Sequence, residues 1–217
     1  MNISKIFLGL LLLEITNLGT VVPMLFETET FLETEMDTSP EMDASFYSVL
    51  FTAIEKENAD KVEQLLLSSN VCIDKQGEWR DTQTTPLIMA SICGSADIVE
   101  ILIRFGADVN KTDEFGGTPL LWASFWNHPQ IVALLIGKGA DVNRANNKGI
   151  TPLYWASCWG FVEIVDILLR AGANPNQADI NGRTPLNVAT ERNFTKIVEI
   201  LIKAGAVVAY HSICSIL

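Results

Sequence analysis

The chain has 217 residues, of which 48% are apolar and 19% charged, and its formal net charge is −11. This composition is typical of an ordered protein and argues against a nucleic-acid partner, because phosphate recognition requires clustered Lys and Arg. The charge is uneven, since residues 1–45 contain one Lys and eight acidic residues and therefore carry −7 of the total. We expect an acidic N-terminal segment that is distinct from the rest of the chain.

That segment, residues 1–45, joins an apolar leader to an acidic stretch. Residues 6–13 are apolar, but they are too few to span a bilayer as a helix, and only Lys5 precedes them. No clear small-residue cleavage site follows, so a secretory signal and a disordered or loosely docked leader both stay open. Residues 27–43 are acidic without a helical stripe, which predicts a flexible tail.

Beyond this segment a motif recurs every 33 residues. Thr-Pro-Leu is followed three residues later by Ala, then by Gly or Asn, and then by an apolar stretch that ends in Gly-Ala; the motif begins at Thr85, Thr118, Thr151 and Thr184. Thr caps a helix start, Pro suits the first turn, and Gly or Asn ends a helix in the left-handed conformation. Apolar residues at i, i+3 and i+4 in each later stretch predict a second helix. Each unit is thus a helix–turn–helix pair that must stack to bury its apolar side.

A degenerate copy precedes the four regular ones. Residues 48–53 align with the motif but lack Pro, and Glu57 stands where Gly is expected. The connection that follows, residues 74–85, is three residues longer than the other connections. A polar, altered first unit is what the end of a stack requires, whereas the last unit is less well protected.

With this motif and period, the sequence resembles the ankyrin repeat family, whose unit carries T-P-L-H-x-A. The resemblance covers residues 46–209 and implies an all-α fold, an ankyrin-repeat solenoid of about five helix–turn–helix units with β-turn fingers between them. A C-terminal tail, residues 210–217, follows the repeat domain. We place the units at residues 46–81, 82–114, 115–147, 148–180 and 181–209.

The resemblance also implies where a partner protein binds. In proteins similar to this one, the second and third residues after the alanine of each motif face a concave groove and vary with the partner. At these and neighbouring positions the middle units are apolar and the last is charged, which is typical of a binding patch with a polar rim. The predicted partner-binding residues are Ile92, Phe115, Phe125, Trp126, Tyr154, Trp159, Glu191 and Arg192.

Within this set we expect Phe125, Trp126 and Trp159 to be exposed in the groove. Trp122 and Trp155, which lie one helical turn earlier, are expected in the core. The alternative is that all five rings stack into ordinary core, and a third is that the leader folds back over them.

Three residues are candidate modification sites. Cys214 begins the terminal sequence Cys-Ser-Ile-Leu, which has the form of a prenylation signal, although no polybasic stretch precedes it. Asn110 and Asn143 occupy the position that is hydroxylated in many ankyrin repeats. The simpler alternatives are an apolar tail that completes the last repeat and asparagines that hydrogen-bond the finger turns.

Catalysis has little support in the sequence. The histidines are His128 and His211, and no Ser, Cys or carboxylate is paired with them by spacing. The cysteines lack metal-ligand spacing and no glycine-rich phosphate loop occurs, so we expect no enzyme, metal or cofactor. The sequence favours a cytoplasmic adaptor or scaffold that binds another protein. A membrane-associated or secreted protein, located by its leader or by lipidated Cys214, is the alternative.

Overall fold

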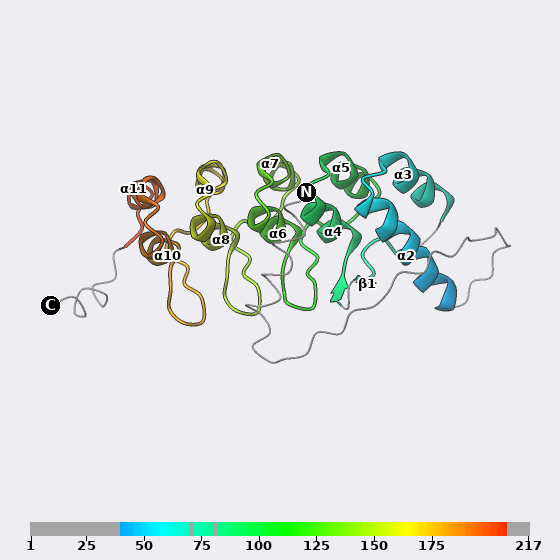
Figure 1. The fold of residues 1–217 in the computed structure, drawn as a ribbon, viewed down its shortest axis with the longest axis horizontal. Helices are drawn as coiled ribbons and strands as arrows, with labels where there is room; N and C mark the ends of the chain where they lie inside the picture. The colour runs from blue at the N-terminus through cyan, green and yellow to red at the C-terminus, as the bar shows by residue number, and fades with distance from the viewer. Residues whose placement is uncertain (1–39, 70–71, 80–81, 208–217) are drawn as a thin grey trace, which may run out of the picture. The chain divides into compact units, whose positions relative to one another are not determined.

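The computed structural model describes residues 40–69, 72–79 and 82–207. The leader as far as residue 39, the C-terminal tail and Cys214 lie outside the described residues. Within these ranges, ten helices form five consecutive pairs (Figure 1). The pairs are α2 (Pro40–Glu55) with α3 (Ala59–Ser68), α4 (Pro86–Cys93) with α5 (Ala96–Arg104), α6 (Pro119–Phe125) with α7 (Pro129–Gly137), α8 (Pro152–Trp159) with α9 (Val162–Arg170), and α10 (Pro185–Glu191) with α11 (Thr195–Lys203).

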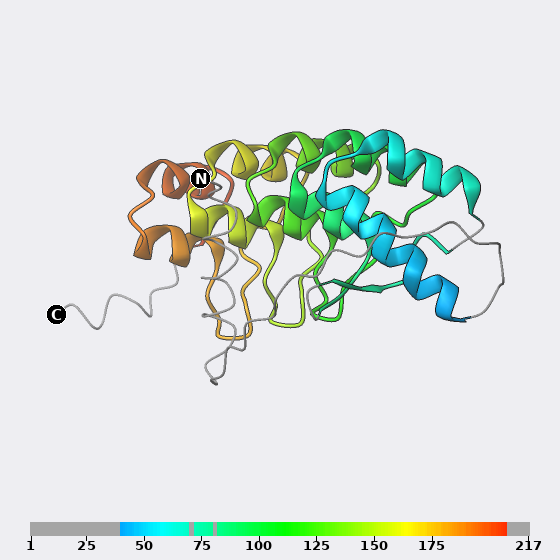
Figure 2. The same ribbon diagram turned by 45° about the vertical axis from the view of Figure 1, so that its right-hand side comes forward.

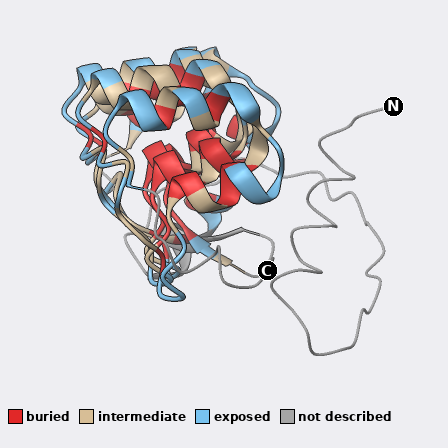
Figure 3. Cartoon of the chain, turned by 90° about the vertical axis from the view of Figure 1, so that its left-hand side faces the viewer, coloured by how far each residue is buried: buried red, intermediate tan, exposed pale blue. Residues whose placement is uncertain are grey.

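The pairs stack in chain order, which confirms the predicted solenoid of about five units. The first helix of each pair packs against the first helix of the next, and the second helices form a parallel layer beside them (Figure 2). Most of the buried residues lie in the first helices and on the inner side of the second helices (Figure 3). None of the helices among the described residues is long and apolar enough to cross a membrane.

The recurring Thr-Pro pair starts the first helix of units two to five. Each Thr side chain accepts a hydrogen bond from the backbone N–H three residues later, and Pro occupies the first turn. In the last unit the cap is reciprocal, because the Thr184 N–H also donates to the side-chain oxygen of Asn187. The predicted capping chemistry is therefore present in all four regular units.

The first helices end in the left-handed conformation, and at two of these ends the next unit packs closely. The φ angles of Gly94 and Gly160 are 85° and 82°. A Cβ added at Gly94 would lie 2.5 Å from the His128 ring, and one added at Gly160 would lie 2.9 Å from the Phe194 ring. Glycine is therefore required at these two positions both by its backbone conformation and by the ring of the following unit.

His128 has a structural role in this packing. Its Nε2 lies 3.1 Å from the Ile92 carbonyl oxygen, so that nitrogen carries the proton and donates. Burial lowers the pKa of His128 below its ordinary value, although the Ile92 carbonyl and the charge of Glu57 act in the opposite direction. A neutral imidazole therefore joins the second and third units.

Two features of the first unit differ from the prediction. The helix α2 begins at Pro40, so residues 40–45, which we assigned to the leader and flexible tail, are helical and the boundary at residue 46 was too late. The longer first connection forms a short antiparallel hairpin of β1 (Gly77–Trp79) and β2 (Thr82–Thr84), with Gly77 opposite Thr84. Three additional residues give this finger enough length to pair with itself, whereas the later fingers are single turns.

A glycine comparison tests the packing between neighbouring units. Gly160→Ala should lower the free energy of unfolding by about 2–4 kcal/mol, because the new methyl group is strained at positive φ and meets the Phe194 ring. Gly172→Ala is the matched control, since Gly172 has a φ of 89° but nothing lies within 4 Å of an added Cβ. Its cost should be only about 1 kcal/mol. Equal losses in urea denaturation would show that Phe194 does not constrain Gly160.

Candidate functional site

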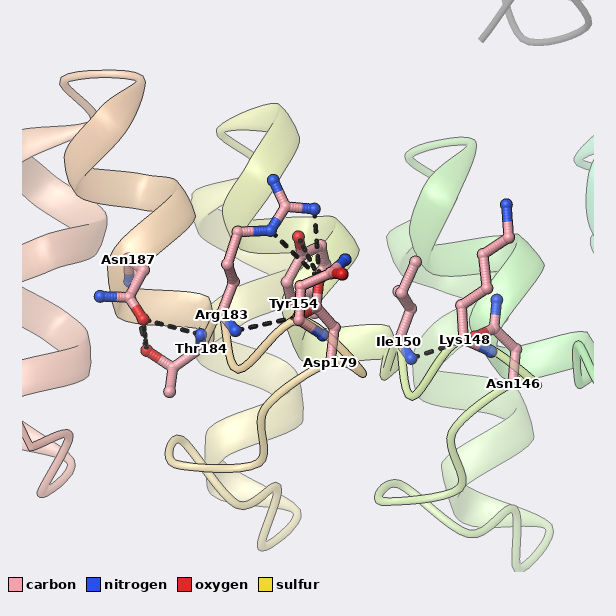
Figure 4. Close-up of polar contacts among 9 residues, drawn as sticks. Asn146, Lys148, Ile150, Tyr154, Asp179, Arg183, Thr184 and Asn187 are labelled. Carbon is pink, nitrogen blue, oxygen red and sulfur yellow. Dashed lines mark hydrogen bonds and ion pairs between the residues drawn. The ribbon is translucent and has the colours of Figure 1, made fainter. Parts of the chain in front are cut away.

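The fingers that border the first helices are held by one repeated side-chain interaction. In each of the last three fingers an Asp or Asn, at Asp113, Asn146 and Asp179, accepts two backbone N–H groups with its Oδ1. The distances are 2.7 and 2.9 Å at Asp113, 3.0 and 3.0 Å at Asn146, and 2.9 and 2.9 Å at Asp179. Figure 4 shows the last two of these turns side by side. The short polar side chain replaces a backbone partner and closes each turn.

Successive fingers also bond to one another. The Asn147 N–H donates to the Phe115 carbonyl oxygen over 3.0 Å, and the Ile180 N–H donates to the Lys148 carbonyl oxygen over 3.1 Å. These bonds set the register between neighbouring fingertips, so the residues at the tips hold defined positions along the stack.

Aromatic side chains then connect the fingers to the first helices. Trp122 on α6 donates its Nε1–H to Asp113 Oδ2 over 2.7 Å, and the Tyr154 hydroxyl on α8 donates to Asp179 Oδ2 over 3.2 Å. Arg183 also pairs with Asp179 Oδ2, at 3.1 Å from its Nη2, and its guanidinium lies 5.9 Å from the centre of the Tyr154 ring (Figure 4). The two carboxylates thus bond a finger and a helix at the same time.

This connection corrects one predicted site residue. Tyr154, which we assigned to partner binding, is only 2% exposed and its hydroxyl is engaged by Asp179. It therefore supports the fingers rather than presenting a surface to a partner.

The two carboxylates differ in electrostatics. Burial raises the pKa of Asp113, and the hydrogen bonds from Gly117, Trp122 and Phe115 only partly offset that effect. Burial also acts to raise the pKa of Asp179, but hydrogen bonds from Arg183 and Asn181 outweigh it and lower the pKa below its ordinary value. Asp179 also accepts from the Arg183 guanidinium and the Tyr154 hydroxyl, whereas Asp113 has no cation bonded to it among the described residues.

Five rings from α6 and α8 form what we call the aromatic cluster, namely Trp122, Phe125, Trp126, Trp155 and Trp159. Phe125 lies at its centre, with ring centroids at 5.9 Å from Trp122, 5.3 Å from Trp126, 4.8 Å from Trp155 and 5.8 Å from Trp159, all edge to face. Trp155 stacks on Trp159 with an interplanar angle of 21°. Edge-to-face pairs each contribute about 0.5–1.5 kcal/mol beyond the area they bury, so the cluster is well ordered.

The arrangement of these rings differs from the prediction. Phe125 is only 7% exposed, so the expectation that it faces the groove was wrong; the four indoles around it exclude solvent. Trp122 and Trp155, which we expected in the core, are half-buried, as are Trp126 and Trp159. The exposed part of the cluster is therefore made by the four indoles, with Phe125 buried among them.

The remaining predicted site residues border this cluster or lie further along the stack. Glu191 and Arg192 at the end of α10 are exposed, and the Arg192 guanidinium lies 4.9 Å from the centre of the Trp159 ring. Phe115 is 45% exposed on a fingertip, and Ile92 on α4 is half-buried. The structure brings Trp126, Trp159 and Arg192 together, because they occupy equivalent positions 33 residues apart in three stacked units.

The Trp126 Nε1–H is buried and makes no hydrogen bond within the described part of the chain, unlike the Nε1–H of Trp122. An unsatisfied buried donor costs about 1–3 kcal/mol, so this side of the cluster carries an energetic cost in the isolated chain.

Comparison with known families agrees with this architecture. The chain matches the family described as "Ankyrin repeats (3 copies)" over residues 28–113, 50–146 and 140–211. The chain belongs to the ankyrin repeat family. Ankyrin repeats are generally protein–protein interaction modules and typically non-enzymatic scaffolds. No curated protein matches the chain.

The two candidate hydroxylation sites of this ankyrin array hold neighbouring units together. Asn110 Oδ1 accepts from the Asp141 N–H over 2.8 Å, and its Nδ2 donates to the Gly139 carbonyl oxygen over 3.3 Å. Asn143 makes the same two bonds in the next unit, at 2.7 and 3.2 Å. Both therefore have the turn-bonding role that we considered as the alternative, and their hydroxylation stays a prediction.

The sequence reading missed a third member of this series. Asn176 accepts from the Val207 N–H over 2.7 Å and donates to the Gly205 carbonyl oxygen over 3.0 Å. Its spacing of 33 residues from Asn143 was the available signal, but Asn-Pro-Asn at residues 174–176 replaces the Asp-Val-Asn of the earlier units.

The charge of Asp179 should make finger stability depend on pH. A carboxylate whose folded-state pKa is lowered stabilises the fold above its unfolded value, near 3.8, and this contribution is lost as the pH falls through the folded-state pKa. Asp179→Asn should therefore lower the unfolding free energy at neutral pH and converge with the wild type in strong acid. Asn146 shows that Asn can close the same turn. Denaturant titrations across pH 2–7 measure the difference, and a constant difference would contradict the assignment.

Proposed function

We propose that this ankyrin array is an adaptor or regulatory scaffold that binds a partner protein through the aromatic cluster, with Glu191 and Arg192 at its polar rim. The observation that carries this proposal is the incomplete burial of four indoles gathered on neighbouring first helices. Trp is the residue type most enriched in the energetic centres of protein interfaces, and contiguous apolar surface on a monomer marks an interaction site.

The order within the cluster also supports binding. Phe125 contacts all four indoles, so their positions are set before a partner arrives. A partner that covers them therefore loses little side-chain entropy, which raises the affinity that a given contact area provides. The bonds from Trp122 to Asp113 and from Tyr154 to Asp179 also fix these two helices against the fingers.

We further propose that the protein acts in the cytoplasm. The described cysteines Cys72, Cys93 and Cys158 are thiols rather than disulfides, in keeping with a reducing compartment. The leader and Cys214, on which a secreted or membrane-associated alternative depends, lie outside the described residues.

A double substitution tests the binding face. Trp126→Ala with Trp159→Ala should weaken partner capture by about a hundredfold or more, since buried Trp anchors contribute about 2–4 kcal/mol each. Affinity purification from an extract with the full chain, followed by mass spectrometry, identifies the partner, and titration of that partner measures the loss.

The matched control is Leu67→Ala with Ile202→Ala, which removes exposed apolar side chains from the second helices α3 and α11. This control should bind as the wild type does. Circular dichroism and thermal melts of both variants verify that the helices are retained. Full capture by a folded Trp126→Ala, Trp159→Ala variant would show that the partner binds elsewhere.

A further inference from the structure

Three arginines among the described residues lie over an aromatic ring. Arg104 lies 5.8 Å from the centre of Phe105, Arg183 lies 5.9 Å from that of Tyr154, and Arg192 lies 4.9 Å from that of Trp159. The first two also hold a carboxylate, Glu63 for Arg104 and Asp179 for Arg183. Arg192 has the shortest distance to its ring, yet its guanidinium makes no ion pair or hydrogen bond with any described residue.

The position of Arg192 leaves its hydrogen-bonding groups available. It is exposed at the C-cap of α10, and the ring of Trp159 lies against its guanidinium. A guanidinium has five N–H donors that point outward in its own plane, and no described residue accepts a hydrogen bond from those of Arg192. The indole also restricts the long side chain, which lowers the entropy cost of binding a carboxylate bidentately.

The charges nearby do not supply that carboxylate. Glu191 adjoins Arg192 in the chain, but neighbouring residues at the end of a helix do not face each other, and the charge of Glu191 acts instead on Arg183. Asp179 is buried and engaged by Arg183 and Tyr154.

We infer that Arg192 is the anchor for an acidic side chain of the partner, and that the partner segment is an acidic peptide whose apolar residues cover Trp126 and Trp159. The inference rests on the proposed function and specifies its partner chemistry. The Glu or Asp carboxylate bonds the edge of the Arg192 guanidinium while Trp159 remains against its face. This completes at the binding face the ring–arginine–carboxylate arrangement that the chain already forms at Arg104 and Arg183.

Short fluorescent peptides provide the probe. In one series the leucine and phenylalanine content stays constant while glutamine is replaced stepwise by glutamate, and anisotropy with the full chain measures binding. We expect affinity to rise with glutamate content and to fall with added salt. Arg192→Gln should remove about a tenfold preference for the glutamate-rich peptide. Arg192→Lys should retain only part of it, because lysine lacks the planar fork.

The control variant is Arg170→Gln. Arg170 is an exposed arginine on α9 that pairs with Asp166 at 2.8 Å, so its loss changes the net charge equally without touching the aromatic cluster. It should leave the preference unchanged. If Arg170→Gln and Arg192→Gln lost the preference for the glutamate-rich peptide equally, net charge alone would explain that preference and the inference would be overturned.

The acidic residues between positions 27 and 37 have the same chemistry as the glutamate peptides, so their effect on peptide binding is measured separately. A second form of the full chain carries amides in place of the acidic residues between positions 27 and 37. A glutamate preference in this form alone supports the inference and identifies that stretch as the competitor. Equal binding of the glutamate and glutamine peptides by both forms of the chain, or no peptide binding by either form, overturns the inference.

The Trp variants separate the two proposals. Peptide binding could be independent of glutamate content and still be lost in the Trp126→Ala, Trp159→Ala variant. That result would support the proposed binding face and reject only the role of Arg192. A glutamate preference that survives the Trp substitutions would instead place Arg192 outside the proposed face.

Discussion

Each helix pair of this chain has an apolar side that only its neighbours can cover, and the remaining features depend on that constraint. Leu87, Leu120 and Leu153, which follow the recurring proline, are at most 1% exposed, and so are the alanines three residues beyond these leucines. Small side chains at those alanines let first helices approach closely, which aligns equivalent positions of successive units. The 33-residue period of the sequence thereby becomes a spatial period, and residues 33 positions apart become neighbours.

This alignment explains how a cluster of five rings arises from two short helices. Trp122 and Trp155 are equivalent, as are Trp126 and Trp159, so stacking α6 on α8 brings two pairs of indoles together around Phe125. In the next unit the position of Trp159 is taken by Arg192, which extends the row with a cation. Because Arg replaces Trp at this position in the last unit, the row has an apolar part at Trp126 and Trp159 and a charged end at Arg192.

The fingers contribute the rigidity of this surface. Asp113 and Asp179 each close a finger turn with one oxygen and hold an aromatic side chain of a first helix with the other. Because neighbouring fingers also bond to one another, a displacement of one fingertip would strain two helices. Burial acts to raise the pKa of both carboxylates, but hydrogen bonds outweigh this effect only at Asp179. Of the two, Asp179 is the one that bonds a guanidinium among the described residues.

The sequence by itself determined the repeat period, the five helix pairs, the capping residues and the rows in which equivalent residues lie, because these depend on contacts within one unit or on regular spacing. The tertiary structure decided which members of the rows are accessible. The motif placed Phe125 and Tyr154 on the partner surface, but the Trp159 ring of the next unit packs against Phe125, and the Asp179 carboxylate of the following finger binds the Tyr154 hydroxyl. The same holds for Arg192, whose guanidinium has no carboxylate partner among the described residues, whereas those of Arg104 and Arg183 pair with Glu63 and Asp179. Burial and pairing are properties of neighbours in space, and these neighbours come from other helices and fingers of the stack.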